Sequence, residues 1–359
     1  MLNEKRAFVS LIIFSILFTL SVAASPKQDS TAQDEKILEW KKRLKEYPPA
    51  KISTELTFQY SFPSDELQKK DIYLWGPRRI ACDSGGNIFV LDGKWKSILK
   101  FDSKGNFLKK NGREGQGPGE FQNPYCFCVS KNAILVSDTA KRDIQIFDLD
   151  LNFVKSLKVG RGYTELVVRD DGLMVGTPFR MAKEMSLVDV LSKDGEVLYS
   201  FGKLMFGDDR NWQVPNFVKI DVNRKGEVFL AFWHFPTVCK YSAEGELRAV
   251  YRIVHKGMSW AEQLNLKAMK DPENRTYWQA IYAIRAKENG FFLLYNYPYT
   301  EALEFDGDGK MINDYCVARS YDYSVADFLV KETDGIEVLF MEIAPENKID
   351  VFRPSKAKR

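Results

Sequence analysis

Histidine and cysteine are scarce in this 359-residue chain, and neither sign of charge dominates. Only two histidines, His234 and His255, are present, so a zinc site with three histidine ligands is excluded. The 52 lysines and arginines nearly balance 49 aspartates and glutamates, which leaves a net charge of +3. Such a balance gives little electrostatic attraction for polyanions, so no nucleic-acid partner is expected.

Long hydrophobic runs are also missing, apart from one short run near the N-terminus. Lys5 and Arg6 precede the apolar segment 7–20, and small residues follow at 21–25. A basic start, an apolar middle and an A-x-A-like end are typical of a signal peptide. The apolar segment is short for a membrane span of about 20 residues, which favours cleavage over an uncleaved anchor. We therefore expect residues 1–24 to be removed, no stable membrane span to remain, and the chain to be exported, either periplasmic or secreted.

The cysteine count is odd, so at least one thiol stays free in an oxidising compartment. The five are Cys82, Cys126, Cys128, Cys239 and Cys316. If the segment around Cys126 and Cys128 is a strand, both sulfurs point to one face of it, and one of them can bridge to Cys82 on a neighbouring strand. The alternative is that all five are small buried apolar residues. The sequence leaves both interpretations open.

The chain is rich in aromatic residues, with 25 Phe, 16 Tyr and 7 Trp, and it contains a repeated pattern of turns and strands. Six segments place a polar turn before a short apolar strand, with turns at positions 86, 132, 172, 226, 290 and 335. A second turn follows in the first five units. Between the two turns lies an alternating strand that ends in an aromatic residue, as in 98–101. Glycine and asparagine supply the positive φ of tight hairpins, and the alternation indicates half-buried strands.

Units of this size with four antiparallel strands are typical of propeller blades. The sequence therefore predicts an all-β, six-bladed β-propeller over residues 51–356, with four-stranded antiparallel blades. A β-sandwich accounts less well for six copies of the same turns. The sixth unit ends after Phe352 without an outer strand, and the alternating segment 56–62 can provide it, so we expect a ring closed by an N-terminal strand. Residues 25–50 are predicted to form a helical lead-in.

One segment resembles a known family. Residues 112–121 read GREGQGPGEF, and with Asn123 and Pro124 they resemble the connector of NHL-type propeller repeats. The whole segment 83–121, which includes Asp92 and the turn at Gly105, resembles one complete NHL repeat. Later units keep the strands and turns but lose this connector. NHL rings are largely binding modules, with some enzymes among their relatives, so the resemblance implies the fold and leaves the function open.

Large side chains are concentrated in the loops of one predicted face. The short glycine turns fall on the opposite face. The face with the large side chains is formed by the loops between the second and third strands of each blade and by the connectors between blades. Exposed aromatic and arginine side chains on a rigid scaffold are typical of binding surfaces. The candidate ligand-binding residues are Trp95, Arg142, Phe179, Arg180, Trp233, His234, Tyr297 and Tyr299. Aromatics can stack on a sugar or hold a peptide, and Arg142 and Arg180 can pair with carboxylate or phosphate. For any single residue the pattern favours packing between blades, and for the face as a whole it favours binding.

Two functions follow from this face. The first is an exported NHL-like β-propeller that acts as a binding or interaction module for a protein, peptide or glycan ligand. The alternative is a metal-dependent lactonase, lyase or hydrolase that holds its metal on the propeller axis through oxygen ligands. No cofactor and no catalytic residue are predicted, and a divalent metal stays open. A structural role as an assembly subunit is a third interpretation.

Overall fold

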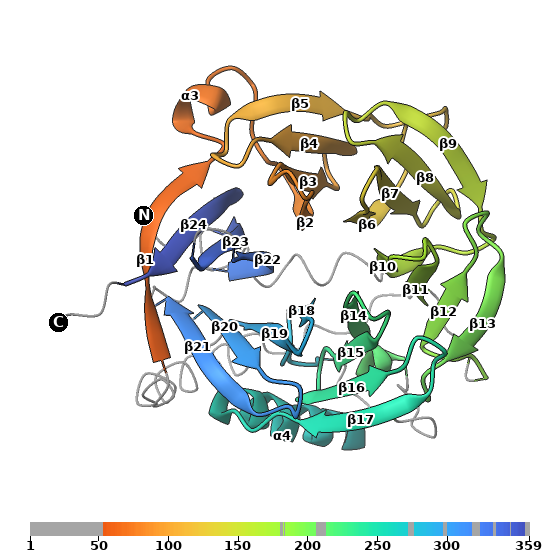
Figure 1. Ribbon diagram of the computed structural model, residues 1–359, viewed down its shortest axis with the longest axis vertical. Coiled ribbons are helices and arrows are strands. Elements are labelled where there is room, and N and C mark those ends of the chain that lie inside the picture. The colour runs from red at the N-terminus through yellow and green to blue at the C-terminus, as the bar shows by residue number, and fades with distance from the viewer. Residues whose placement is uncertain are drawn as a thin grey trace, which may run out of the picture.

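Tight glycine turns and alternating apolar residues fold the chain into successive antiparallel sheets. In the computed structural model these sheets stand around a central axis like propeller blades (Figure 1). The structure describes residues 53–179, 182, 184–205, 213–271, 276–296, 300–317, 324–332, 335–344 and 346–355. The predicted signal peptide, 1–24, and helical lead-in, 25–50, lie outside the described residues. No helix within the described ranges is long and apolar enough to cross a membrane.

Four sheets have four strands each, and their strands follow chain order from the axis to the rim. The first contains β2 (Pro77–Cys82), β3 (Ile88–Asp92), β4 (Ser97–Phe101) and β5 (Phe107–Asn111). The second contains β6 (Pro124–Val129), β7 (Ala133–Asp138), β8 (Asp143–Asp148) and β9 (Phe153–Lys158). The third contains β10 (Tyr163–Val168), β11 (Met174–Pro178), β12 (Val188–Leu191) and β13 (Val197–Phe201). The fourth contains β14 (Val218–Val222), β15 (Val228–Phe232), β16 (Thr237–Tyr241) and β17 (Leu247–Arg252).

The fifth sheet has eight strands, in the order β18-β19-β20-β21-β1-β24-β23-β22. Their bounds are β18 (Ala283–Lys287), β19 (Gly290–Tyr295), β20 (Thr300–Phe305), β21 (Met311–Val317), β1 (Ser53–Phe62), β24 (Lys348–Pro354), β23 (Glu337–Ala344) and β22 (Ser324–Lys331). β1 pairs antiparallel with β24, and its first three residues pair parallel with β21. The prediction of six separate blades is therefore wrong for the sheets as they form, because β1 joins the last eight strands into one sheet. The pairing of segment 56–62 with the last strand agrees with the sequence pattern.

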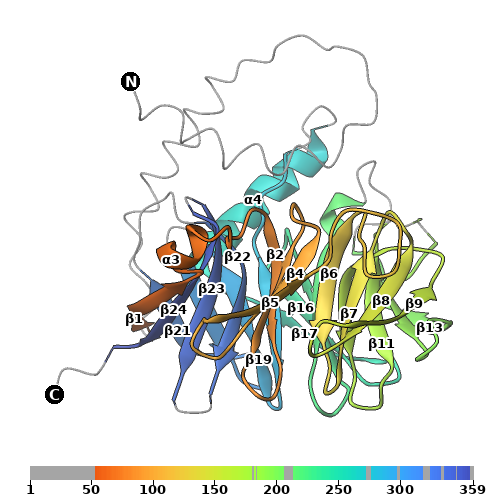
Figure 2. The ribbon, with the colours of Figure 1, turned by 90° about the horizontal axis from the view of Figure 1, so that it is seen from above.

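The loops divide between two faces (Figure 2). Tight turns such as Asp102–Asn106 lie on one face, where the Asp102 carboxylate accepts the N–H groups of Lys104 and Asn106. The segment at Asp306, which resembles part of a calcium loop, is a turn of the same kind. The opposite face carries the connectors between sheets and the helices η2 (Val214–Asn216) and α4 (Lys256–Lys270). We call it the connector face. The short helix α3 (Asp65–Gln68) lies at the rim, next to the Lys104–Asn106 turn.

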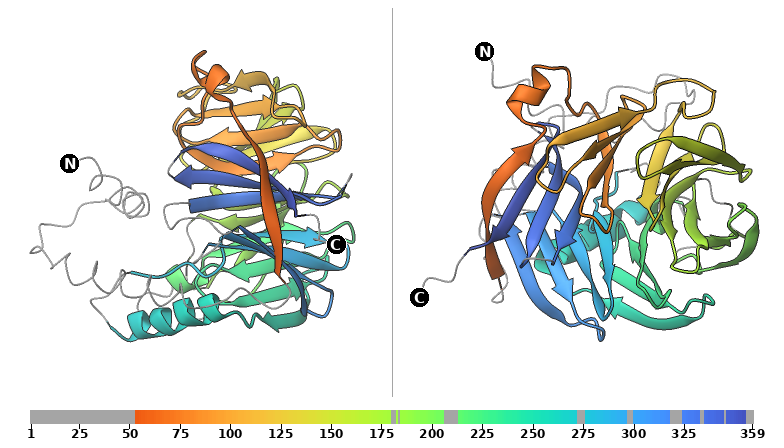
Figure 3. Two further views of the ribbon diagram at one scale, coloured as in Figure 1. Left: turned by 90° about the vertical axis from the view of Figure 1, so that its left-hand side faces the viewer. Right: turned by 45° about the horizontal axis from the view of Figure 1, so that its top comes forward.

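Apolar side chains fill the spaces between neighbouring sheets. One core cluster joins Phe62 of β1 to Phe101 of β4 and Leu339 of β23, and another joins α4 to β15 and β19. Figure 3 shows β1 running along the rim of the ring, with α3 at one end. All five cysteines are free and four are buried, so no disulfide with Cys82 forms. Cys126 and Cys128 share one core cluster, as their alternation predicts.

A charged axis with an aromatic mouth

The innermost strands begin at the connector face, and four of them begin with the same irregularity. In β2, β6, β10 and β22 one residue is skipped in the pairing with the second strand. The skipped residues are Arg78, Tyr125, Thr164 and Ala326. Such β-bulges bend a strand and re-aim its side chains. The residues that follow directly are Arg79, Cys126, Glu165 and Asp327.

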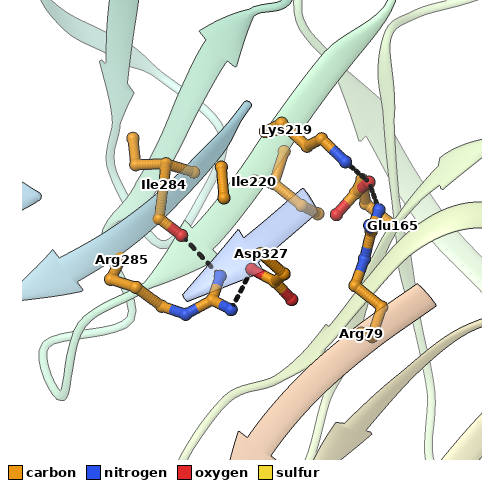
Figure 4. A pocket seen from close by; sticks show the side chains of 8 residues that line it. Arg79, Glu165, Lys219, Ile220, Ile284, Arg285 and Asp327 are labelled. Carbon is orange, nitrogen blue, oxygen red and sulfur yellow. Dashed lines mark hydrogen bonds and ion pairs between the residues drawn. The ribbon is translucent and has the colours of Figure 1, made fainter. Parts of the chain in front are cut away.

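Five charged side chains from five innermost strands meet at the axis (Figure 4). This axial cluster consists of Arg79, Glu165, Lys219, Arg285 and Asp327. Glu165 pairs with Arg79 and accepts a hydrogen bond of 3.0 Å from the Lys219 ammonium group. Across the axis, Asp327 pairs with Arg285 and accepts the Ile80 N–H at 3.2 Å. The space left between these side chains is about 10 Å³, which is roughly the room for one water molecule.

Burial changes the proton affinity of this cluster. Side-chain exposure is 6% for Lys219 and 10% for Glu165. Burial, followed by the charge of Arg79, lowers the pKa of Lys219 to about 8. Asp221, two residues along β14, accepts the Ala286 N–H at 2.8 Å, and burial raises its pKa. The axis is therefore polar and closely packed, with charged groups whose proton affinity is set by burial and by one another.

Aromatic rings surround the connector-face end of this cluster. The Trp233 ring lies over the Lys219 ammonium group, with 4.5 Å between the nitrogen and the ring centroid, and it packs against Phe217 at 5.5 Å. On the other side, Tyr125 packs against Phe179 at 5.5 Å, and the Arg78 guanidinium lies 5.3 Å from the Tyr125 ring centroid. We call these residues, Arg78, Tyr125, Phe179, Phe217 and Trp233, the axial mouth.

The structure brings two of the predicted site residues to this mouth and separates the others. Trp233 and Phe179 belong to it. Trp95 lies in a different patch, where its ring meets Tyr73 at 5.1 Å and Trp75 at 5.5 Å, with the Lys110 ammonium group 3.7 Å from its centroid. Trp75 is 50% exposed. We call Tyr73, Trp75, Lys94, Trp95 and Lys110 the rim patch.

Asp92 holds the loop that carries Trp95. Its carboxylate is completely buried and accepts four backbone N–H groups, two from the connector at Trp75 and Gly76 and two from the turn at Lys94 and Trp95. Asp138 does the same in the second sheet. Asp92, the aspartate of the NHL-like segment, thus joins a connector to a turn through hydrogen bonds. This role explains why it lies at the end of the second strand of its sheet.

The remaining candidates do not join the mouth. His234 is 6% exposed and its Nδ1 lies 3.1 Å from the Trp278 carbonyl oxygen, so it is a packed residue. Burial lowers the pKa of His234 to about 4. Arg142 is exposed in the turn between β7 and β8, at a φ of 54°. Arg180, Tyr297 and Tyr299 lie outside the described residues.

Sequence reasoning missed the axial cluster altogether. A signal for it exists, because each innermost strand except β6 carries a charged residue next to apolar ones shortly after a connector, as in Val218-Lys219-Ile220 and Ile284-Arg285-Ala286. The predicted site residues all come from predicted loops and include none of these strand positions. Within the described ranges, no group of three or more His, Cys, Asp or Glu side chains is arranged to hold a metal ion.

Comparison with known proteins places the chain beside others of unassigned function. The family DUF4934, described as a domain of unknown function, matches residues 67–317. No curated protein matches. The NHL-type resemblance is not confirmed by this match and stays a prediction.

Several solved structures share the fold. A Bacteroides fragilis protein described as a putative exported protein has a TM-score of 0.58 at 15% identity, covering 85% of this chain and 99% of its own. A DUF4221 member from Bacteroides vulgatus has a TM-score of 0.57 at 14% identity, with coverage of 85% and 99%. A streptogramin B lyase has a TM-score of 0.54 at 13% identity, with coverage of 84% and 98%. At these identities the likeness shows a propeller-like fold alone.

Proposed function

Because the chain belongs to the DUF4934 family, whose description assigns no function, we propose from its geometry that it is an exported binding module. It takes a protein, peptide or glycan ligand at the axial mouth. The observation that carries this proposal is the convergence of aromatic side chains from three sheets on one end of the axis. Rigid aromatic side chains beside buried charges are the usual anchors of binding sites.

Three further features support the proposal. The side chains beneath the mouth form ion pairs with one another and leave only a small space between them, so most of the ligand contact falls to the mouth and its loops. Export agrees with the predicted signal peptide, and a structural neighbour is described as a putative exported protein. We further propose that the eight-stranded sheet represents two four-stranded blades joined through β1. The ring then has six blades and is closed by its N-terminal strand, in agreement with the sequence-based prediction for residues 51–356.

A metal-dependent enzyme is the second candidate. The observation behind it is the shared fold with a streptogramin B lyase, at 13% identity. Metal analysis of the purified chain separates the two candidates. A stoichiometric divalent ion that disappears with an axial substitution such as Asp327→Asn favours a lactonase, lyase or hydrolase, and a metal-free protein that still binds its ligand favours the binding module.

Mouth substitutions test the binding module. Ligands are first identified with immobilised glycans and a peptide library, and their dissociation constants are then measured by calorimetry. We expect Trp233→Ala and Phe179→Ala each to weaken binding by about tenfold or more, since buried aromatic anchors contribute about 2 kcal/mol or more. Trp95→Ala in the rim patch is the matched control and should bind like the wild type. Unchanged affinity in both folded mouth variants would contradict the proposal.

A further inference from the structure

The axial cluster contains more positive than negative charge. Arg79, Lys219 and Arg285 face only two carboxylates, those of Glu165 and Asp327. The neighbouring acid Asp221 does not line the space between these side chains; its carboxylate accepts the N–H groups of Ala286 and Val222 and also interacts with the charge of Arg285. An excess charge buried in a protein interior is costly unless a counter-charge neutralises it.

Hydrogen-bond donors are also in excess. An arginine can donate five hydrogen bonds and a lysine three. Among the described residues, Arg79 donates one to the Arg78 carbonyl oxygen and one to Glu165, and Lys219 donates one, to Glu165. Arg285 donates three, to the carbonyl oxygens of Ile284 and Ile80 and to Asp327. The cluster therefore presents several N–H groups with no acceptor in the described part of the chain. A group with acceptor oxygens and one negative charge complements both imbalances.

Space and access limit what this group can be. About 10 Å³ lies between the cationic and acidic side chains of the cluster, enough for one oxygen atom but not for a ring. Arg79 and Arg285 keep side-chain exposures of 15% and 25%, so the cluster is not sealed. Lys219 links it to the mouth, because its ammonium group contacts both Glu165 and the Trp233 ring. A singly charged planar group fits the single excess charge better than a doubly charged phosphate.

We propose that the axial cluster is an anion site that binds one carboxylate group of the ligand held at the axial mouth. One carboxylate oxygen enters the space between Arg79, Lys219 and Arg285, and the rest of the ligand stays among the aromatic rings. The assignment of a ligand to this site rests on the proposed function, but the site itself can be tested without any ligand being known.

Formate, the smallest carboxylate, is the probe, and formamide is its neutral counterpart of the same shape. The full chain, in a buffer free of carboxylates and low in chloride, is titrated with each by calorimetry and followed by thermal unfolding. We expect formate to bind saturably and to raise the melting temperature, and formamide to do neither. Lys219→Met should weaken formate binding by about tenfold or more, in line with a lost charged hydrogen bond.

Lys110→Met is the matched control, because Lys110 also lies over a tryptophan ring but belongs to the rim patch. It should bind formate like the wild type. Equal effects of formate and formamide on the wild type would overturn the proposal, as would unchanged formate binding by folded Lys219→Met. If Lys219→Met does not fold, the wild-type comparison decides, and Lys219→Arg, which keeps the charge, should retain binding.

The two proposals fail in different ways. Formate does not need the aromatic mouth, so absent formate binding overturns the anion site and leaves the binding module standing. Unchanged ligand affinity in Trp233→Ala and Phe179→Ala overturns the binding module, whatever formate does.

Discussion

His234 shows how burial removes a side chain from a binding surface. It lies between Trp233 and Phe235 in sequence, and only Trp233 reaches the mouth. The His234 ring packs between Tyr277, at 5.6 Å between centroids, and Trp233, at 6.3 Å, and the Asn265 side-chain amide donates to the His234 carbonyl oxygen. The side chain therefore fastens the loop after β15 to the segment around Trp278. Two adjacent residues of one loop thus have different roles: His234 fixes the loop in place, and Trp233 faces the axis.

The buried histidine gives a prediction about pH. Its pKa is about 4 in the folded chain, against 6.5 for an ordinary histidine. Between these values the unfolded state binds a proton that the folded state does not, so stability falls as the pH is lowered from 6.5 to 4. The loss from this residue amounts to about 3 kcal/mol at most. Urea unfolding of the wild type and His234→Asn at several pH values should show a shallower slope for the variant across this window. Parallel curves would show that His234 contributes no such dependence.

At the scale of elements, the sequence predicts strands and turns well because both are local. The glycine turns fix the hairpins, since their positive φ lets the chain reverse tightly. The bulges of β2, β6, β10 and β22 are a different matter. A bulge depends on how two strands pair, and no local residue pattern in these strands requires it. The mouth side chains Arg78 and Tyr125 are bulged residues, so their position could not be predicted.

The strand β1 offers a prediction with its own internal control. Phe62 is 2% exposed and packs against Phe101 at 5.0 Å, whereas Phe58 on the same strand is 45% exposed. Replacing a buried phenylalanine by alanine removes contacts and leaves a cavity, at a cost of about 3–5 kcal/mol. We expect Phe62→Ala to lose stability on this scale in chemical unfolding, and Phe58→Ala to lose clearly less. Equal losses would mean that the seam between β1 and the first sheet does not depend on this core contact.

At the scale of the whole molecule, the candidate site exists only because the ring closes. The five charged residues of the axial cluster come from positions between 79 and 327, and the sequence alone cannot show that they meet. It does predict that both ends of the chain belong to one ring, since the alternating segment 56–62 can supply the outer strand that the last unit lacks. Closure by β1 brings the last sheet, with Arg285 and Asp327, against the first sheet, with Arg79.

Two truncations test what closure contributes. Removing residues 1–62 deletes β1, which leaves the hydrogen-bonding edges of β21 and β24 unpaired. Unpaired edges invite pairing with other chains, so we expect a lower melting temperature and self-association in light scattering. Removing only residues 1–50 keeps β1 and is the matched control. Its melting temperature and monodispersity should equal those of a chain that lacks only the first 24 residues. Asp327 of the last sheet accepts a hydrogen bond from Ile80 of the first sheet, so the axial cluster depends on contact between these two sheets. The chain that lacks residues 1–62 should therefore also lose formate binding. The prediction is wrong if the chain without β1 has the same melting temperature, monodispersity and formate affinity as the control. The axial cluster would then form without the N-terminal strand.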